Sequence, residues 1–169
     1  PTTSYGGFSG PPAPATTTGS TNITVTNLEV MASNLVSNVS CNGGNDGVAD
    51  LTVAGGITPY TFLWSNSATT EDISSIAAAT YYVTITDNLA CSTTDTAIVG
   101  EPTILTTSIS GNNITCNGGN NGTATISPSG GTAPYNYFWS MGQISSTAVG
   151  LYPGTYTVNI VDINGCPVN

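Results

Sequence analysis

Apolar and polar side chains alternate along most of the chain after residue 20. A period of two is typical of half-buried β-strands, whose successive side chains point to opposite faces of a sheet. No stretch has the period of a helix, and Ser75 to Ala79 is predicted to form at most a short turn. The pattern therefore predicts an all-β protein. Its apolar positions include Ile23, Val25, Val48, Leu51, Val53, Tyr60, Phe62, Trp64, Tyr81, Val83 and Ile85.

The pattern recurs after 75 residues without a gap. Cys41-Asn-Gly-Gly returns at Cys116, Pro59-Tyr60 at Pro134-Tyr135, and Trp64-Ser65 at Trp139-Ser140. A fixed period of this length indicates tandem domains, each near the lower size limit for independent stability. Glycine pairs between the short strands mark tight turns. We therefore expect two tandem immunoglobulin-like antiparallel β-sandwich repeats of about 75 residues, with Trp64 and Trp139 in their cores.

Composition divides the chain into four segments. Residues 1–20 are rich in Pro, Thr, Ser and Gly and have too few aliphatic side chains to order themselves. They are expected to form either a flexible linker or a stalk with O-glycans on Thr2, Thr3, Ser4, Thr16, Thr17 and Thr18. Residues 21–37 are expected to hold a leading strand and a junction. The first repeat is expected to span 38–102, and the second 103–169.

Cysteine spacing is the same in both repeats. Fifty residues separate Cys41 from Cys91, and the same number separates Cys116 from Cys166. Of the three possible connectivities, we expect Cys41–Cys91 and Cys116–Cys166, one disulfide in each repeat; the alternative is four free buried thiols. Disulfides indicate an oxidising setting outside the cell. Asp87 and Asp162 precede the second cysteine of each repeat and are expected to cap the turn leading into it.

The charged residues are all acidic. The chain has nine carboxylates and no Lys, Arg or His. Binding to nucleic acid and to anionic membranes requires cations, so neither partner is expected. No window is apolar enough to cross a membrane. Without a His or Lys, nucleophiles lack an activating base, and the adjacent Glu71 and Asp72 point to opposite faces if extended, so no catalytic residue and no enzyme activity are expected.

Oxygen ligands make calcium the only plausible metal. However, no calcium-loop spacing occurs among the first repeat's carboxylates, and the second repeat keeps only Asp162 of this set. A site encoded by the repeat should be present in both copies, so we expect no metal and no cofactor. The carboxylates considered are Asp46, Asp50, Glu71, Asp72 and Asp87.

Several motifs together resemble a known repeat family. They are Cys-Asn-Gly-Gly, Gly-Gly-x-x-Pro-Tyr, Trp-Ser, Gly-Thr-Tyr-x-Val and Asp-x-x-Gly-Cys, and they span residues 38–169. In combination they resemble the SprB-type repeat of secreted surface adhesins of Bacteroidetes, including gliding adhesins. The resemblance implies export to the cell surface, array architecture and adhesive or structural use, with no catalytic residue. The first repeat departs from the family at Ala79 and Ala90, where glycine is preferred.

The repeat register also concerns the ends of the chain. The first repeat continues past Cys91 through a predicted closing strand, for which the second has no equivalent. The segment Thr21, Asn22, Ile23, Thr24 and Val25 lies at the offset of Thr96–Gly100. Either the chain is a window cut from a longer array, or this segment is a donor strand that completes the last domain of a neighbouring subunit.

We therefore expect a secreted structural subunit or segment of a fibre or adhesin stalk, with copies of itself as end-to-end partners and surface glycans or other cell-surface components as further partners. Asp95-Thr96-Ala97 resembles the O-glycosylation motif of Bacteroidetes, with Thr96 as the acceptor. The sequons at Asn22, Asn38, Asn113 and Asn121 matter only in a host with N-linked transfer. The alternative function is a carbohydrate-binding module that uses exposed aromatic side chains, with Tyr60, Tyr135 and Tyr152 as candidates.

Overall fold

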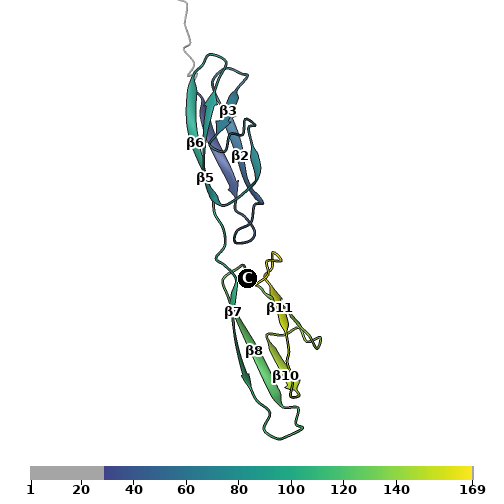
Figure 1. The fold of residues 1–169 in the computed structure, drawn as a ribbon. Coiled ribbons are helices and arrows are strands. Elements are labelled where there is room, and N and C mark those ends of the chain that lie inside the picture. Colours follow the sequence, from purple (N-terminus) through teal and green to yellow (C-terminus); the bar gives the residue numbers. More distant parts are fainter. Residues whose placement is uncertain (1–28, 169) are drawn as a thin grey trace, which may run out of the picture.

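A computed structural model describes residues 29–168, which form two β-sandwiches stacked end to end in an elongated molecule (Figure 1). All strand pairs are antiparallel, and the described residues contain no helix. The predicted fold class, tandem antiparallel sandwiches, is confirmed.

The first sandwich consists of two three-stranded sheets. One has the order β1 (Met31–Ser37), β2 (Gly47–Ala54) and β4 (Ile73–Ile76). The other has the order β3 (Thr61–Trp64), β5 (Ala79–Thr86) and β6 (Ser92–Val99). Because β1 pairs with β2 along its whole length, the first domain starts before the expected boundary at residue 38.

The second sandwich repeats this arrangement with one strand fewer among the described residues. Its first sheet has the order β7 (Thr106–Asn112), β8 (Gly122–Ser129) and β10 (Thr147–Leu151). Its second sheet consists of β9 (Asn136–Trp139) and β11 (Val158–Val161) only. No described strand occupies the position that β6 takes in the first sandwich.

A tryptophan lies at the centre of each core. Trp64 is 2% exposed and Trp139 is 4% exposed, and the indole N–H of each donates to a backbone carbonyl, that of Thr70 (3.0 Å) or Ser145 (2.9 Å). Burial of such a large side chain, with its polar atom satisfied, is a main contribution to a small core. Ala97 and Val99 of β6 belong to the first core, and the second core has no counterpart of them among its described residues.

The short turn predicted from Ser75 to Ala79 is incorrect. The structure places β4 across Ile73–Ile76 and starts β5 at Ala79. Ile73 and Ile76 are both buried although they are three positions apart, because the register with β2 shifts at this point and Ser75 takes a positive φ of 57°. Such a bulge breaks the period of two by which a strand is recognised.

Candidate functional site: an open groove and the inter-repeat junction

The free edge of β11 is the main difference between the two sandwiches. In the first sandwich, β5 pairs with β6 along all eight residues, whereas only Val83–Thr86 also pair with β3. In the second, β11 retains the four residues that pair with β9. Residues 154–157, whose equivalents in β5 have β6 as their ladder partner, are not a strand. Among the described residues, no strand pairs with the outer edge of β11, and residues 154–157 therefore have no ladder partner.

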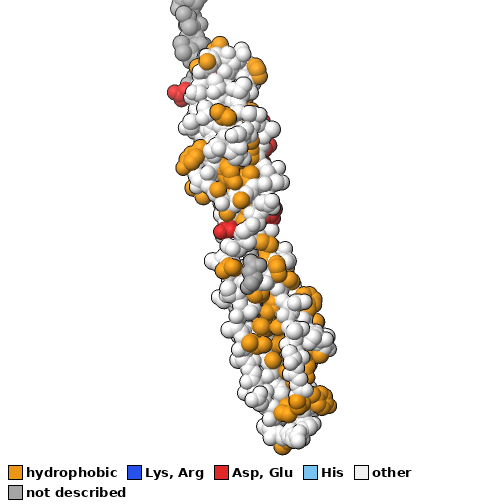
Figure 2. Space-filling view, in the orientation of Figure 1, with side chains coloured by type: hydrophobic (Ala, Val, Ile, Leu, Met, Phe, Trp, Pro, Cys, Tyr) orange, Lys and Arg blue, Asp and Glu red, His pale blue; other side chains and the backbone are white. Residues whose placement is uncertain are grey.

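A groove of about 520 Å³ lies where β6 would fit. Its walls come from β7 on one side and β11 on the other, and Figure 2 shows hydrophobic side chains gathered along this face of the second domain. Ile109 lines the groove and is 63% exposed, and Val158 is half-buried, whereas its equivalent Val83 is 1% exposed. The floor of the groove is thus apolar surface that β6 covers in the first domain.

A second hollow, of about 300 Å³, continues the same path toward the far end of the domain. Asn113, Ile114 and Leu151 line it. In the first domain, the equivalents of the first two, Asn38 and Val39, hold the end of the closing strand: Gly100 N–H donates to Asn38 Oδ1 (2.8 Å), and Val39 N–H donates to the Gly100 carbonyl (3.1 Å). Together, the two hollows follow the whole course of a closing strand.

The chain enters this path in the register of the first domain. Val161 forms an isolated antiparallel bridge with Pro167, as Thr86 pairs with Ser92 at the equivalent positions. The N–H of Val168 donates to the carbonyl of Ile160 (3.3 Å). A strand that fills the groove would therefore extend a ladder that Pro167 and Val168 already begin.

In each sandwich, one buried carboxylate holds the turn that carries the second cysteine of the repeat. Asp87 accepts N–H bonds from Ile57 (3.0 Å), Leu89 (2.9 Å) and Cys91 (2.9 Å). Asp162 accepts the equivalent bonds from Thr132, Asn164 and Cys166, at 2.8–3.0 Å. The expected caps are therefore present, and each also ties its turn to the loop after the glycine pair.

Opposing effects act on these two carboxyl groups. Burial raises the pKa of each by disfavouring the charged form. The backbone N–H donors stabilise the charged form, and together they lower the pKa by more than burial raises it. The net result is a pKa below the ordinary value of 3.8 for both Asp87 and Asp162. Both groups are thus ionised structural elements at neutral pH.

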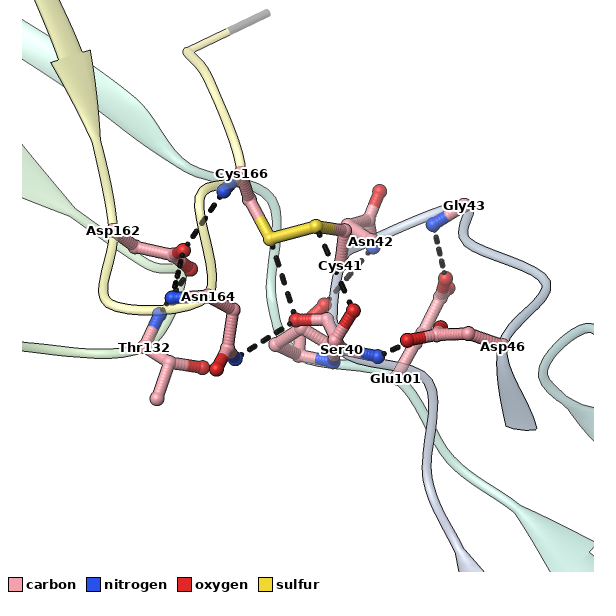
Figure 3. The surroundings of a disulfide bond; sticks show 11 residues. Ser40, Cys41, Asn42, Gly43, Asp46, Glu101, Thr132, Asp162, Asn164 and Cys166 are labelled. Carbon is pink, nitrogen blue, oxygen red and sulfur yellow. Dashed lines mark hydrogen bonds between the residues drawn. A yellow bond between two sulfur atoms is a disulfide. The ribbon is translucent and has the colours of Figure 1, made fainter. Parts of the chain in front are cut away.

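The disulfide lies between the two sandwiches and corrects the expected pairing. Cys41 is bonded to Cys166, with their Cα atoms 5.6 Å apart (Figure 3). Cys41 lies in the β1–β2 loop, near Gly100 at the end of β6, whereas Cys91 precedes the start of β6. The eight residues of β6 separate these ends by about 26 Å, far beyond the roughly 7 Å that a disulfide spans. The pairings Cys41–Cys91 and Cys116–Cys166 are therefore not formed.

Hydrogen bonds surround this disulfide (Figure 3). Asn164 Nδ2 donates to the Ser40 carbonyl (3.1 Å), across the domain boundary. The segment between β6 and β7 is held as well, because Asn42 Nδ2 donates to the Pro102 carbonyl (3.0 Å) and Gly43 N–H donates to Glu101 Oε2 (2.7 Å). At the junction, the β1–β2 loop, the segment between β6 and β7, and the turn that carries Cys166 are thus held together by the disulfide and by hydrogen bonds.

Cys91 and Cys116 are free and exposed. Cys91 lies in the β5–β6 turn, at the end of the first domain away from the second. Cys116 lies in the β7–β8 loop, at the end of the second domain away from the first (Figure 1). The two free thiols therefore lie at opposite ends of the molecule.

The remaining predicted site residues have varied positions. The hydroxyl groups of Tyr60 and Tyr135 donate to the carbonyls of Gly55 and Gly130, and both rings pack against a core, so neither is a free platform for a sugar. Tyr152 is 59% exposed and lines the second hollow. Thr96 is exposed on β6. The glycan candidates Thr2 to Thr18 and the donor-strand candidate Thr21–Val25 lie outside the described residues.

The carboxylates considered for calcium do not form a cluster. Between residues 29 and 168, no group of three or more His, Cys, Asp or Glu side chains is placed to hold a metal ion. Asp46 accepts the Ser40 N–H (3.0 Å), and Asp72 accepts the Leu51 N–H (2.9 Å). Over the same residues, no helix is long and apolar enough to cross a membrane.

Comparison with known proteins identifies the repeat. No curated protein matches the chain. The SprB repeat matches twice, over residues 33–69 and 108–144, which extend from the first strand of each sandwich to just past its tryptophan. The two matches have the same 75-residue offset as the cysteines and the cis peptide bonds at Pro59 and Pro134. The chain therefore contains two SprB repeats.

Proposed function

We propose that this chain is a structural segment of an extracellular stalk or fibre at the cell surface, built from tandem SprB sandwiches joined end to end. The observation that carries the proposal is the groove between β7 and β11, which lies at the position that β6 takes in the first sandwich and has a mostly apolar lining. The elongated stacking of the two sandwiches and the tied junction support it. The SprB repeat is a structural repeat and not an enzyme domain, and the proposed role requires no metal or cofactor.

The proposed occupant of the groove is residues Thr21–Val25 of a second copy, acting as a donor strand. A chain cannot fill its own groove with this segment. Val30 lies beside Gly56 and Asp87, at the end of the first domain away from the second. The four residues between Val25 and Val30 span at most about 18 Å, which is less than the length of the first sandwich. The only groove of this kind that the segment can reach is therefore that of a neighbour placed beyond that end.

The apolar floor favours one register for the proposed donor strand. In β6 the inward side chains are Ala97 and Val99. Residues exactly 75 earlier are Asn22 and Thr24, which are polar. A shift by one residue turns Ile23 and Val25 inward instead, because strand side chains alternate between faces. We propose the shifted register, in which Ile23 and Val25 cover the floor near Ile109, Ile114 and Leu151.

Assembly of the chain under reducing conditions tests this proposal, since a reductant removes disulfide links between copies. Sedimentation velocity and electron microscopy measure the polymers. Ile109→Glu places a charge in the groove, and the double variant Ile23→Asp/Val25→Asp places charges on the donor; both are expected to leave monomers. The matched control is Ile144→Glu, because Ile144 is 74% exposed and lies outside both hollows. It is expected to polymerise as the unaltered chain does.

Two results would contradict donor-strand assembly. One is equal polymerisation of the chain without residues 1–28. The other is a traced fibre in which the groove is filled by residues that follow Asn169 in the same polypeptide, which would make the chain a window of a continuous array. A synthetic peptide of residues 18–28 gives an independent measurement, since it should bind the unaltered chain and not Ile109→Glu.

Glycosylation of the exposed hydroxyl surface is a further part of the proposed function. Thr96 is exposed on β6, and the preceding Asp95 is held by Asn34 Nδ2, which donates to Asp95 Oδ2 (2.7 Å). A glycan there would project from the edge of the first sandwich without displacing core side chains. The intact mass of the native protein, compared with that of Thr96→Ala, tests this acceptor. If the two masses differ only by the substituted side chain, Thr96 carries no glycan and the proposal is contradicted.

A further inference from the structure

The two repeats place equivalent cysteines at both ends of the molecule, yet the chain joins only one pair. Cys41 of the first repeat is bonded to Cys166 of the second. Seventy-five residues separate Cys41 from Cys116, and the same offset separates Cys91 from Cys166. The free Cys116 is thus equivalent to the bonded Cys41, and the free Cys91 is equivalent to the bonded Cys166. One free cysteine lies at each outer end of the molecule.

The loop that carries Cys116 already has the conformation of the loop that carries Cys41. In the bonded loop, Gly44 N–H donates to the Cys41 carbonyl (2.9 Å), and Asp46 Oδ1 accepts from Ser40 N–H (3.0 Å). In the free loop, Gly119 N–H donates to the Cys116 carbonyl (2.9 Å). Asn121 Oδ1 there accepts from Thr115 N–H (3.2 Å). This half of a second junction is preformed.

The turn that carries Cys91 likewise matches the turn that carries Cys166. Asp87 and Asp162 hold these turns through the same set of N–H bonds. The backbone N–H of each Asp also donates to the carbonyl of its cysteine, Cys91 (2.9 Å) or Cys166 (3.1 Å). The other half of the junction is therefore preformed as well.

We propose that Cys116 of one copy forms a disulfide with Cys91 of the next, so that successive copies are covalently linked head to tail. The proposal rests on the end-to-end assembly described above. A neighbour that repeats the internal junction presents its outer Cys91 turn to the Cys116 loop. The fibre would then carry one disulfide at every sandwich boundary, alternately within and between chains.

Bond formation is an ordinary thiol–disulfide exchange. A low-molecular-weight disulfide such as oxidised glutathione accepts the two electrons: one protein thiolate displaces a glutathione thiol, and the second thiolate displaces the other. The products are the Cys116–Cys91 disulfide and two glutathione thiols. Exposure of both cysteines gives the oxidant access before assembly.

One contact differs between the two junctions. Asn164, which donates to the Ser40 carbonyl, is replaced at the equivalent position by Leu89. Leu89 is 62% exposed, and its side chain has no polar group to donate. The inter-chain junction lacks this hydrogen bond, so the disulfide would be a larger part of its stability.

The test uses full-length chains incubated with oxidised glutathione and separated by non-reducing electrophoresis. The unaltered chain is expected to give a ladder of covalent oligomers that a reductant collapses. Cys91→Ser alone and Cys116→Ser alone should each give monomers, whereas their equimolar mixture should give covalent dimers and nothing larger. Both cysteines are exposed, so serine at either position is expected to leave the fold intact. Pepsin digestion and mass spectrometry identify the linked peptides, since trypsin has no site in this chain.

The outcomes separate this inference from the proposed function. Covalent dimers from either single variant would show like-with-like pairing and overturn the inference. Non-covalent polymers under reducing conditions, without the Cys116–Cys91 link under oxidising conditions, would overturn the inference and leave the proposed function standing. Monomers under both conditions would overturn both. A ladder that persists when Ile109→Glu has abolished the non-covalent polymers would support the disulfide and show that it forms without an occupied groove.

Discussion

The carboxylate of Asp162 accepts the backbone N–H of Cys166 at 3.0 Å, four residues along the chain, and Asp87 accepts that of Cys91 at 2.9 Å. Each carboxylate closes a turn of its repeat and is buried while it does so. One of these turns carries the disulfide and the other carries a free thiol. The same carboxylate-capped turn is therefore found at the junction between the sandwiches and at the outer end of the first sandwich.

These carboxylates make the stability of both sandwiches depend on pH. The pKa of each group is lower in the folded chain than its ordinary value of 3.8. A depressed pKa contributes stability that is fully present above the unfolded value and is lost as the pH falls through the folded value. We expect the free energy of unfolding to be flat near neutral pH and to fall below about pH 4. Urea denaturation at a series of pH values measures this.

Asp162→Asn provides the matched variant. Its side chain presents one oxygen and an NH₂ group to three N–H donors, so at least one buried donor loses its acceptor. The expected cost is on the order of 2 kcal/mol for the second sandwich at pH 7, with a weaker dependence on acid. An unchanged acid limb would mean that other groups govern the acid response.

The position of Ala90 predicts a stabilising substitution. Ala90 has a φ of 65°, a left-handed conformation, and the equivalent residue is Gly165, with a φ of 82°. Ala90→Gly should stabilise the first sandwich by about 0.5–1 kcal/mol, the relief of backbone strain less the entropy gained by the unfolded chain. Ala79→Gly is the control, since Ala79 starts β5 without a positive φ and glycine there should be destabilising. Equal effects of the two variants on the thermal midpoint would refute the argument.

Sequence periodicity predicted the architecture because its determinants are local. Alternation and the repeat predict that Trp64 and Trp139 lie in cores, and the position before a cysteine predicts that Asp87 and Asp162 lie at turns. Where the period breaks, as at the bulge of Ser75, alternation does not identify the strand.

The disulfide pairing was beyond the sequence for a different reason. If the two repeats are to form equivalent disulfides, the bonds can lie either within each repeat or between consecutive repeats. Only the direction of β6, which carries the chain from the Cys91 turn to the opposite end, decides between them. The groove was anticipated from the register, but its second hollow at Asn113 and Ile114 was not, since it depends on how Asn38 and Val39 hold Gly100.

Hydrogen exchange should reveal the unpaired edge of β11. Val168 donates to the carbonyl of Ile160, so the alternate residue Val158 directs its N–H toward the open groove. The Thr157 carbonyl accepts the Ser140 N–H on the opposite side, which leaves the Tyr156 N–H on the side of the groove. Their first-domain equivalents, Tyr81 and Val83, lie in the continuous β5–β6 ladder. In the monomer, we expect Tyr156 and Val158 amides to exchange at least about 100-fold faster than those of Tyr81 and Val83.

The same amides should become protected when the groove is occupied. Addition of the residue 18–28 peptide to the monomer is expected to slow exchange at Tyr156 and Val158 and to leave Tyr81 and Val83 unchanged. Strong protection of Tyr156 in the monomer without peptide would show that the edge is already covered, and would count against the open groove.

Breaking the Cys41–Cys166 bond should loosen the junction without unfolding either sandwich. The disulfide closes a loop of 125 residues, for which a chain that unfolds as one unit would lose roughly 5 kcal/mol on the entropy model. However, the two cores are separate clusters, and the bond joins units that fold around different tryptophans. We therefore expect Cys41→Ser/Cys166→Ser, in a Cys91→Ser/Cys116→Ser background, to change the stability of each sandwich by less than about 1 kcal/mol. Small-angle scattering should instead show a broader distribution of interdomain distances than in the background with the bond intact. A loss of several kcal/mol in urea denaturation would show that the sandwiches unfold as one unit, and that the junction is part of a single cooperative structure.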